Sequence, residues 1–215
     1  DFIAPSGFIL LRVIGALSLF AISYFLFINE KVDKKDIFRL AICGIFGVAI
    51  NQLLFFEGLN LTTPINAAIV MTTSPILVIF LSFLIMKEAL TFRKGAGILL
   101  GLCGASMLIL KGGSINFSSN HQLGNLFVFI NAVSYGLYLV IVKPMMGKYN
   151  PITVMFYVFG FGLLYVIPFG FNNLADVKWE IIPSNIYWEI VFVVVCTTFN
   201  AYLLNSSALK QLRPT

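Results

Sequence analysis

Long apolar runs dominate the chain and alternate with short polar breaks. The runs cover residues 6–28, 37–57, 64–86, 95–111, 123–142, 152–171 and 186–209. A helix needs about 20 mainly apolar residues to cross the hydrocarbon core of a bilayer. Membrane β-strands are a poor alternative, because they take about 10 residues and alternate between polar and apolar positions. The pattern predicts an all-α, polytopic membrane helix bundle, with seven transmembrane helices in this chain.

The breaks between the runs have the composition of loops. Residues 29–36 (NEKVDKKD) make a charged turn, and residues 59–64 (LNLTTP) end in a proline that suits the first turn of a helix. The polar break KGGSINFSSNHQ, at 111–122, is the best candidate for a boundary between two halves. We therefore predict a first repeat at 1–111, a linker at 112–122 and a second repeat at 123–215.

Basic residues are distributed unevenly between alternate loops. Successive loops lie on opposite sides of the membrane, and the side rich in Lys and Arg is expected in the cytoplasm. This places loops 29–36, 87–94 and 143–151 in the cytoplasm and residue 1 outside a plasma or inner membrane. Of the 14 basic residues, 11 fall on the rich side: Lys31, Lys34, Lys35, Arg39, Lys87, Arg93, Lys94, Lys143, Lys148, Lys210 and Arg213.

Composition supports the same class of protein. The chain is 59% hydrophobic and only 11% charged, with a mean hydropathy of +0.95, whereas soluble domains carry roughly 25% charged residues. The net charge of +5 comes from short loops, so we expect a topology signal and no nucleic-acid partner. The three cysteines lie inside apolar runs and His121 is the single histidine. We expect no metal and no cofactor.

Two parts of the chain repeat in the same order. Apolar helices open at Pro5 and Pro151, which lie 146 positions apart. The stretch QLLFFEGLNLTTP ends at Pro64, and YLLNSSALKQLRP ends at Pro214, 150 positions later. Completing both copies would need one helix before the chain and two after it, which predicts a ten-helix parent of two five-helix halves. An odd number of helices inverts the second half, as in secondary transporters that bind substrate between their halves.

The stretch at 58–110 resembles the EamA-type unit of the drug/metabolite transporter superfamily. Residues 131–145 are similar to the opening helix of a second unit, and Arg12 also fits the family pattern. The resemblance implies a ten-helix carrier that moves small organic metabolites, often outward, without covalent chemistry. Its matching features are Pro64, Ala67, Ala68, Pro75, Glu88, Gly95 and the glycines up to Gly104.

Arg12 is the most informative charge. It lies about 10 Å inside the helix that begins at Pro5, at ~1.5 Å per residue. Such an arginine snorkels outward, pairs with an acid, or faces a water-lined cavity. Glu57 lies at the outer end of the next predicted helix. We hypothesise that both residues help to form the outer part of a substrate pathway, with snorkelling as the alternative.

Other polar side chains also lie inside the predicted spans. Amides and hydroxyls in hydrocarbon need partners, so they either bond between helices or line a polar cavity. The sequence leaves both roles open. The further candidates for the substrate pathway are Asn51, Gln52, Asn66, Thr72, Thr73, Asn131, Tyr135, Tyr138, Tyr157, Asn200 and Tyr202, and Ser134 and Asn205 are also buried by position.

Two further features are interpreted as structural. Gly97, Gly101 and Gly104 follow the small-xxx-small spacing that lets membrane helices approach closely. Pro75 removes a backbone hydrogen bond in the middle of a span, which predicts a kink that nearby threonines can compensate.

The turn between the predicted helices 64–86 and 95–111 is rich in charge. We interpret it as a cytoplasmic turn that anchors two helix ends at the headgroups. The alternative is an ion pair that opens and closes during transport. The turn contains Lys87, Glu88, Arg93 and Lys94.

The sequence as a whole favours a secondary transporter. We expect no enzyme, because HExxH, GxSxG and P-loop patterns are absent. We expect export of small metabolites, amino acids or drug-like compounds by alternating access. Its partners would be the lipid bilayer and a small-molecule substrate, with a homodimer left open. The alternative is a membrane scaffold, or a membrane enzyme without a recognised motif.

Overall fold

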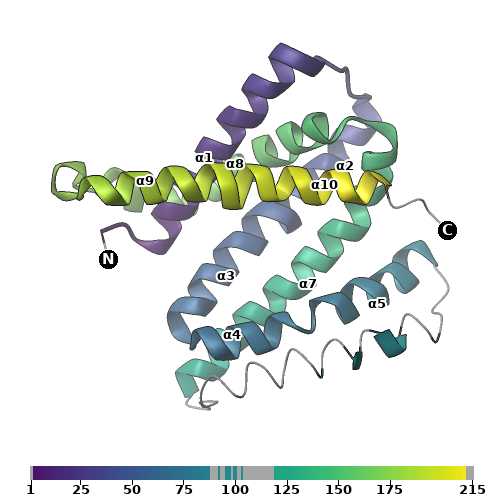
Figure 1. The fold of residues 1–215 in the computed structure, drawn as a ribbon, viewed down its shortest axis with the longest axis horizontal. Helices are drawn as coiled ribbons and strands as arrows, with labels where there is room; N and C mark the ends of the chain where they lie inside the picture. Colours follow the sequence, from purple (N-terminus) through teal and green to yellow (C-terminus); the bar gives the residue numbers. More distant parts are fainter. Residues whose placement is uncertain are drawn as a thin grey trace. The chain divides into compact units, whose positions relative to one another are not determined.

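The computed structural model describes residues 2–87, 92, 95–97, 99–100, 103 and 119–211, and within them it holds helices and no strand (Figure 1). The all-α prediction is confirmed over these residues. The elements are α1 (Pro5–Ser23), η1 (Tyr24–Ile28), α2 (Lys34–Gly44), η2 (Ile45–Ala49), α3 (Ile50–Leu61), α4 (Pro64–Met71), α5 (Ser74–Met86), α7 (Ser119–Lys148), α8 (Pro151–Ala175), η3 (Trp179–Ile181), α9 (Ser184–Phe192), η4 (Val193–Asn200) and α10 (Ala201–Gln211).

Six stretches of the described chain are long and apolar enough to cross a membrane. Each contains one of the apolar runs that the sequence predicts. The seventh predicted helix, 95–111, lies largely outside the described residues, so the seven-helix count and the ten-helix parent stay predictions. The six spans are Pro5–Ile28, Lys34–Leu61, Pro64–Met86, His121–Lys148, Pro151–Ala175 and Ser184–Lys210.

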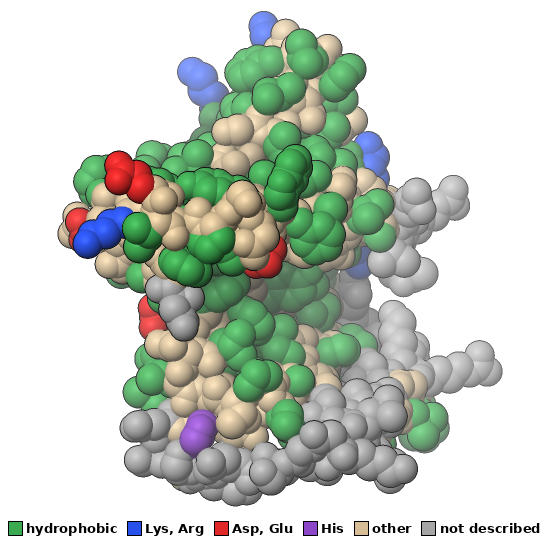
Figure 2. All heavy atoms as spheres, turned by 60° about the vertical axis from the view of Figure 1, so that its left-hand side comes forward, with side chains coloured by type: hydrophobic (Ala, Val, Ile, Leu, Met, Phe, Trp, Pro, Cys, Tyr) green, Lys and Arg blue, Asp and Glu red, His purple; other side chains and the backbone are tan. Residues whose placement is uncertain are grey.

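Large apolar side chains stand on the outside of these spans. Phe27 is 75% exposed, and Phe169 and Phe171 are also exposed. Figure 2 shows hydrophobic side chains over much of the visible face, with acidic and basic groups at only a few places. A surface of this kind is stable against lipid tails and not against water. The chain is a multi-pass membrane protein in contact with the bilayer.

Helix ends follow local backbone chemistry. Pro5, Pro64 and Pro151 stand in the first turns of α1, α4 and α8, where the missing N–H of proline costs no helical hydrogen bond. At the other end, Asn29 after η1 and Lys87 after α5 adopt left-handed backbone, with φ of 45° and 55°. This conformation stops a helix. Lys87 therefore lies where the charged turn was predicted to begin.

The third span is interrupted just before Pro75. α4 ends at Met71, Thr72 and Thr73 form a turn, and α5 starts at Ser74. The hydroxyl of Thr72 donates to the carbonyl of Ile69 (2.6 Å), and the hydroxyl of Thr73 donates to that of Val70 (2.7 Å). The two threonines thus bond the carbonyls of Ile69 and Val70, so compensation at the Met71 carbonyl, which loses its helical donor to Pro75, stays a prediction.

Within the described residues, three spans contain a π-helical segment: η1 ends the first span, and η2 and η4 lie inside the second and the last. η2 (Ile45–Ala49) joins α2 to α3, and η4 (Val193–Asn200) joins α9 to α10. The predicted repeat offset of 150 residues carries η2 onto residues 195–199, which lie inside η4. π-Helix is rare and often marks functional positions, because it displaces backbone groups from the regular ladder. We therefore expect polar side chains to bond the displaced backbone groups of η2 and η4.

The chain divides into two compact units: Asp1–Ala49 with Ile141–Thr215, and Ile50–Val140. In the first unit, α8 packs against α1 and α2. The Phe20 ring lies 5.2 Å from the Phe159 ring and 4.6 Å from the Phe199 ring, measured between centroids. This aromatic group joins α1, α8 and η4 in the core of the first unit.

In the second unit, α3 and α7 approach closely at two glycines. A Cβ added to Gly124 would lie 2.8 Å from the carbonyl oxygen of Gly58, and one added to Gly58 would lie 2.9 Å from that of Gly124. Of the predicted glycine series, Gly97 has nothing within 4 Å of an added Cβ among the described atoms. Gly101 and Gly104 lie outside the described residues, so packing along that series stays a prediction.

The Gly58–Gly124 crossing gives a testable prediction. Gly124→Ala should lower the free energy of unfolding by about 1–3 kcal/mol, because the two backbones must separate to admit the methyl group. Gly147→Ala is the matched control, since nothing lies within 4 Å of its added Cβ. It should be neutral or slightly stabilising, because alanine favours helix. Thermal denaturation in detergent, followed by size-exclusion chromatography, measures both; equal midpoints would contradict the close crossing.

Candidate functional site

Arg12 turns toward a π-helical segment within the first unit. Its Nε and Nη2 donate to the hydroxyl of Thr198 in η4, at 3.2 and 3.1 Å. Thr198 is fully buried, and its hydroxyl donates to the carbonyl of Val193 (2.9 Å). The Phe8 ring also lies 5.9 Å below the Arg12 guanidinium carbon. The guanidinium is therefore held by two hydrogen bonds and an aromatic ring within this unit.

The π-helical segment η2 accepts a hydrogen bond from a tyrosine. Tyr202, on α10, donates its hydroxyl to the carbonyl of Gly47 in η2 (3.0 Å). Its ring packs edge-on against Phe159 at 5.0 Å between centroids. η2 and η4 are thus each contacted by a polar side chain from another span of the same unit. Asn200, which was predicted beside Tyr202 as a pathway residue, is exposed.

Tyr157, another predicted pathway residue, lies in an aromatic group at one end of the first unit. Its ring lies 6.4 Å from Tyr24 and 5.3 Å from Phe156, and Tyr24 stacks on Phe156 at 4.7 Å. This group joins η1 to α8. The structure places Tyr157 in helix packing at this end, and its predicted role in a pathway stays a prediction.

A polar face runs along α7 in the second unit. Asn131, Ser134, Tyr135 and Tyr138 follow at spacings of three and four residues, which is one side of a helix. Asn131, Ser134 and Tyr138 are at most 2% exposed, and the Tyr135 and Tyr138 rings lie 5.9 Å apart. The Asn131 side chain donates to the backbone carbonyl of Asn51 on α3. Polar groups inside the bundle are unusual unless they bond helices together or line a pathway.

The junction of α3 and α4 carries a second small network. Thr62 donates to the amide oxygen of Asn125 (2.7 Å), and the Asn66 side chain donates to the hydroxyl of Thr62 (3.3 Å). The backbone N–H of Asn66 also bonds the Thr63 hydroxyl, which caps α4 (3.2 Å). Asn66 therefore has a structural role at this helix start, and Thr72 and Thr73 bond their own helix.

The predicted residues fall into two groups, one in each unit. Arg12 and Tyr202 lie in the first unit, and Asn51, Gln52 and Asn131 lie in the second. Glu57 is a half-buried residue of α3 in the second unit, so its predicted relation to Arg12 stays a prediction. Asn205 lies on α10 in the first unit. Of the predicted charged turn, Glu88, Arg93 and Lys94 lie outside the described residues.

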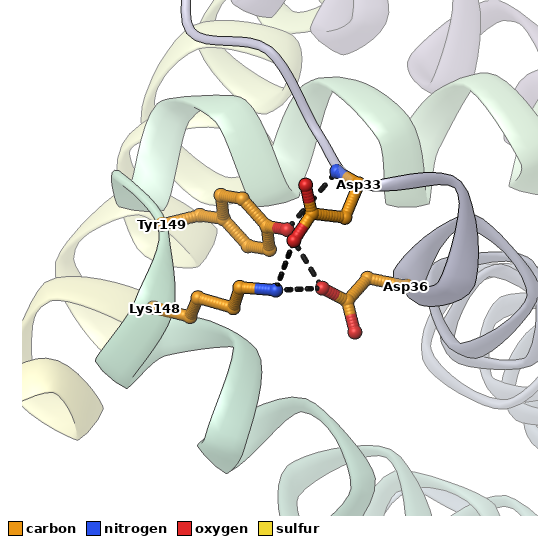
Figure 3. Close-up of polar contacts among 4 residues, drawn as sticks. All are labelled: Asp33, Asp36, Lys148 and Tyr149. Carbon is orange, nitrogen blue, oxygen red and sulfur yellow. Dashed lines mark hydrogen bonds and ion pairs between the residues drawn. The ribbon is translucent and has the colours of Figure 1, made fainter.

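Sequence reasoning missed a polar cluster between two loops that it had placed on one membrane side (Figure 3). The ammonium group of Lys148 contacts the carboxylates of Asp33 (2.5 Å) and Asp36 (2.6 Å). The hydroxyl of Tyr149 donates to Asp36 (2.7 Å) and accepts from the backbone N–H of Asp33 (3.1 Å). The sequence contains Lys148 and Tyr149 at the end of one helix and two aspartates, three residues apart, at the start of another. No local sequence pattern predicts that these two pairs are in contact. We call these four residues the latch cluster.

Two further contacts extend the latch cluster. The Glu30 carboxylate accepts from the backbone N–H of Asn150 (2.9 Å), and the Tyr24 hydroxyl donates to the Glu30 carbonyl (2.6 Å). The loop before α2 is therefore held to the junction of α7 and α8 by backbone and side chains together. Among the described residues, no group of three or more His, Cys, Asp or Glu side chains could hold a metal ion.

Comparison with known proteins places these features in a family. The model of the EamA-like transporter family matches residues 1–110 and 122–215. The chain is 26% identical over 192 residues to "Uncharacterized transporter YetK" of Bacillus subtilis, covering 86% of this chain and 58% of that protein. It is 23% identical over 139 residues to the "Probable terminal-alkyne amino-acid exporter" of Streptantibioticus cattleyicolor, covering 65% of this chain and 46% of that protein.

The fold also matches a solved structure. One crystal structure of a protein superposes with a TM-score of 0.73 at 20% identity, over 97% of this chain and 71% of that one. The spans and their buried polar groups define a polytopic helical membrane protein. The chain belongs to the EamA-like transporter family. It spans 58% of the length of the Bacillus relative.

The contact between Arg12 and η4 yields a prediction with a neighbouring control. Thr198→Val keeps the shape of the side chain but removes the acceptor of two guanidinium donors. It should lower the free energy of unfolding by about 1.5–3 kcal/mol, the range for hydrogen bonds to charged groups. Thr197→Val is the control, because exposed Thr197 bonds the same Val193 carbonyl (2.8 Å). Chemical denaturation in detergent should separate the two variants, and equal losses would contradict this role of Thr198.

Proposed function

We propose that this chain works as part of a secondary transporter that exports small amphipathic metabolites by alternating access between two inverted halves. The observation that carries the proposal is that polar side chains lie buried within the apolar spans. Asn131, Ser134 and Tyr138 of α7 are nearly inaccessible to solvent. Family membership gives this buried polar face its meaning, since transporters hold their substrate sites inside such bundles.

Helix packing in the first unit supports two related halves. The offset of 146 relates Gly15 to Phe161, and the offset of 150 relates Gly44 to Val194. If the halves are related, a contact between Gly15 and Val194 therefore predicts a contact between Phe161 and Gly44. Both contacts occur: a Cβ on Gly15 would lie 2.7 Å from Val194, and one on Gly44 would lie 2.9 Å from Phe161. At both pairs of related positions, a glycine in one half corresponds to a larger residue in the other half. The matching π-helical segments and the two stretches that match the family model support the same repeat.

The substrate class and direction rest on similarity and on chemistry. One relative carries the name of an amino-acid exporter, which favours outward movement of amino acids or related compounds. Amide and tyrosine side chains on α3 and α7 suit a ligand that has both polar and apolar parts. We infer that amino acids and drug-like metabolites of similar size are the substrates.

The contact between loops supports the proposed orientation. Residues 29–36 and 143–151 were both assigned to the cytoplasmic side by their basic residues, and the latch cluster brings the two loops together. In a carrier that alternates its access, groups at one end must close and reopen. We infer that the latch cluster holds the cytoplasmic end of the first unit in one of these states.

Transport by the complete gene product tests the proposal directly. Cells that lack related exporters would express it and be loaded with a labelled panel of amino acids and small amphipathic metabolites. We expect faster efflux of at least one compound than in cells with empty vector. An equal loss of every compound, with the protein verified in the membrane, would contradict the transporter assignment and favour the scaffold alternative.

The latch cluster gives a second prediction for the same assay. Lys148→Asp should reduce the transport rate several-fold, because three carboxylates would then repel one another at this end. Adding Asp36→Lys should restore part of the rate by reversing the ion pair. Lys35→Asp is the matched control, since exposed Lys35 lies in the first turn of α2, next to Asp36 but outside the cluster. Failure of the reversed pair to recover any activity, with normal amounts of folded protein, would contradict an ion-pair latch.

A further inference from the structure

Two buried amide side chains in the second unit lack hydrogen-bond partners within the described part of the chain. Gln52 on α3 is 4% exposed, and neither its Nε2 nor its Oε1 has a partner there. Asn131 on α7 is 1% exposed; its Nδ2 is bonded, but its Oδ1 has no partner among the described residues. A buried polar group without a partner is unfavourable, and several of them in one place suggest that something else supplies the bonds.

The side chains of Gln52 and Asn131 start from neighbouring positions on α3 and α7. Asn131 bonds the carbonyl of Asn51, which belongs to the same peptide group as the N–H of Gln52. The side chain of Gln52 therefore starts directly beside the point where Asn131 contacts α3. From Asn131, the polar face of α7 continues through Tyr135 and Tyr138, which offer aromatic surface. Hydrogen-bonding amides and aromatic rings therefore occupy neighbouring positions along a short length of α3 and α7.

The site recognises its ligand by hydrogen bonds more than by charge. Within the described residues of this unit, the acidic and basic side chains are Glu57, Lys87 and His121. Lys87 and His121 stand at span ends, and Glu57 lies five residues beyond Gln52, or ~7.5 Å along the helix axis. Gln52 presents N–H donors and a carbonyl acceptor, and Asn131 adds another acceptor.

We propose that Gln52 and Asn131 form a cargo-binding site for an uncharged amide group, which donates and accepts hydrogen bonds at the crossing of α3 and α7. The inference rests on the proposed transport function and adds the chemical class of the cargo. An amide matches this set of donors and acceptors, whereas a carboxylate would place its charge against two carbonyl oxygens. The tyrosines of α7 would pack against the apolar remainder of the same molecule.

The binding test compares amides with their acids in the complete gene product. Three labelled pairs serve as probes: L-glutamine with L-glutamate, L-asparagine with L-aspartate, and nicotinamide with nicotinate. We expect the protein to prefer the amide in at least one pair. Gln52→Met should raise the KM for that amide roughly tenfold, the change that ~1.4 kcal/mol of binding energy gives. Preference for the acids, or an amide preference that Gln52→Met leaves intact, would overturn the proposal.

A stability measurement separates this proposal from the transport proposal. Gln52→Met should raise the thermal midpoint of the ligand-free protein, because it replaces unpartnered polar atoms with an apolar chain of similar volume. Thr153→Val is the control: buried Thr153 on α8 also carries a hydroxyl without a partner among the described residues. It should raise the midpoint and leave every KM unchanged.

The outcomes decide each proposal in turn. If the broad panel finds no transported compound, the transport proposal fails, and the cargo site that rests on it fails with it. If a cargo is found but Gln52→Met lowers the midpoint and no pair is distinguished, the amide site is wrong and the transport proposal stands. Equal KM shifts in Gln52→Met and Thr153→Val would also count against the site.

Discussion

The cost of leaving a polar group unpaired inside an apolar bundle is the constraint on which this structure depends. Hydrocarbon offers no hydrogen bonds, so a polar group within a span is stabilised by a partner in the protein or by a bound molecule. Arg12 meets this requirement through Thr198, which in turn bonds Val193. Tyr202 does the same for the carbonyl of Gly47. These pairs fix where the spans of the first unit contact one another.

Irregular backbone and polar side chains occur together for the same reason. A π-helical segment displaces carbonyls from the regular ladder, and in η2 and η4 a tyrosine and a threonine bond such groups. The break before Pro75 is handled locally, since Thr72 and Thr73 bond the carbonyls of the preceding turn. These contacts keep the irregular backbone of the spans bonded within the protein, as the transport cycle that we propose would require.

Much of the fold follows from the sequence because hydropathy acts locally. The six described spans, the helices that open at Pro5 and Pro151 and the break near Pro75 all depend on neighbouring residues. The partner of Arg12 could not be found in this way, because Thr198 is distant in sequence and contacts it only through helix packing. The latch cluster was missed for the same reason. The close approach of Gly58 and Gly124 was also missed, because these two glycines lie in different spans and no local spacing relates them.

Water access to the polar face of α7 tests the central claim most directly. Ser134→Cys would be made in the complete protein after Cys43, Cys103 and Cys196 are replaced, with exposed Phe129→Cys on the same helix as the control for a lipid-facing position. The account predicts that a small, charged thiol reagent modifies the cysteine at 134 in membranes and that transported cargo slows this reaction, while the cysteine at 129 stays unmodified. An unreactive cysteine at 134 under all conditions would mean that the buried polar face only holds helices together.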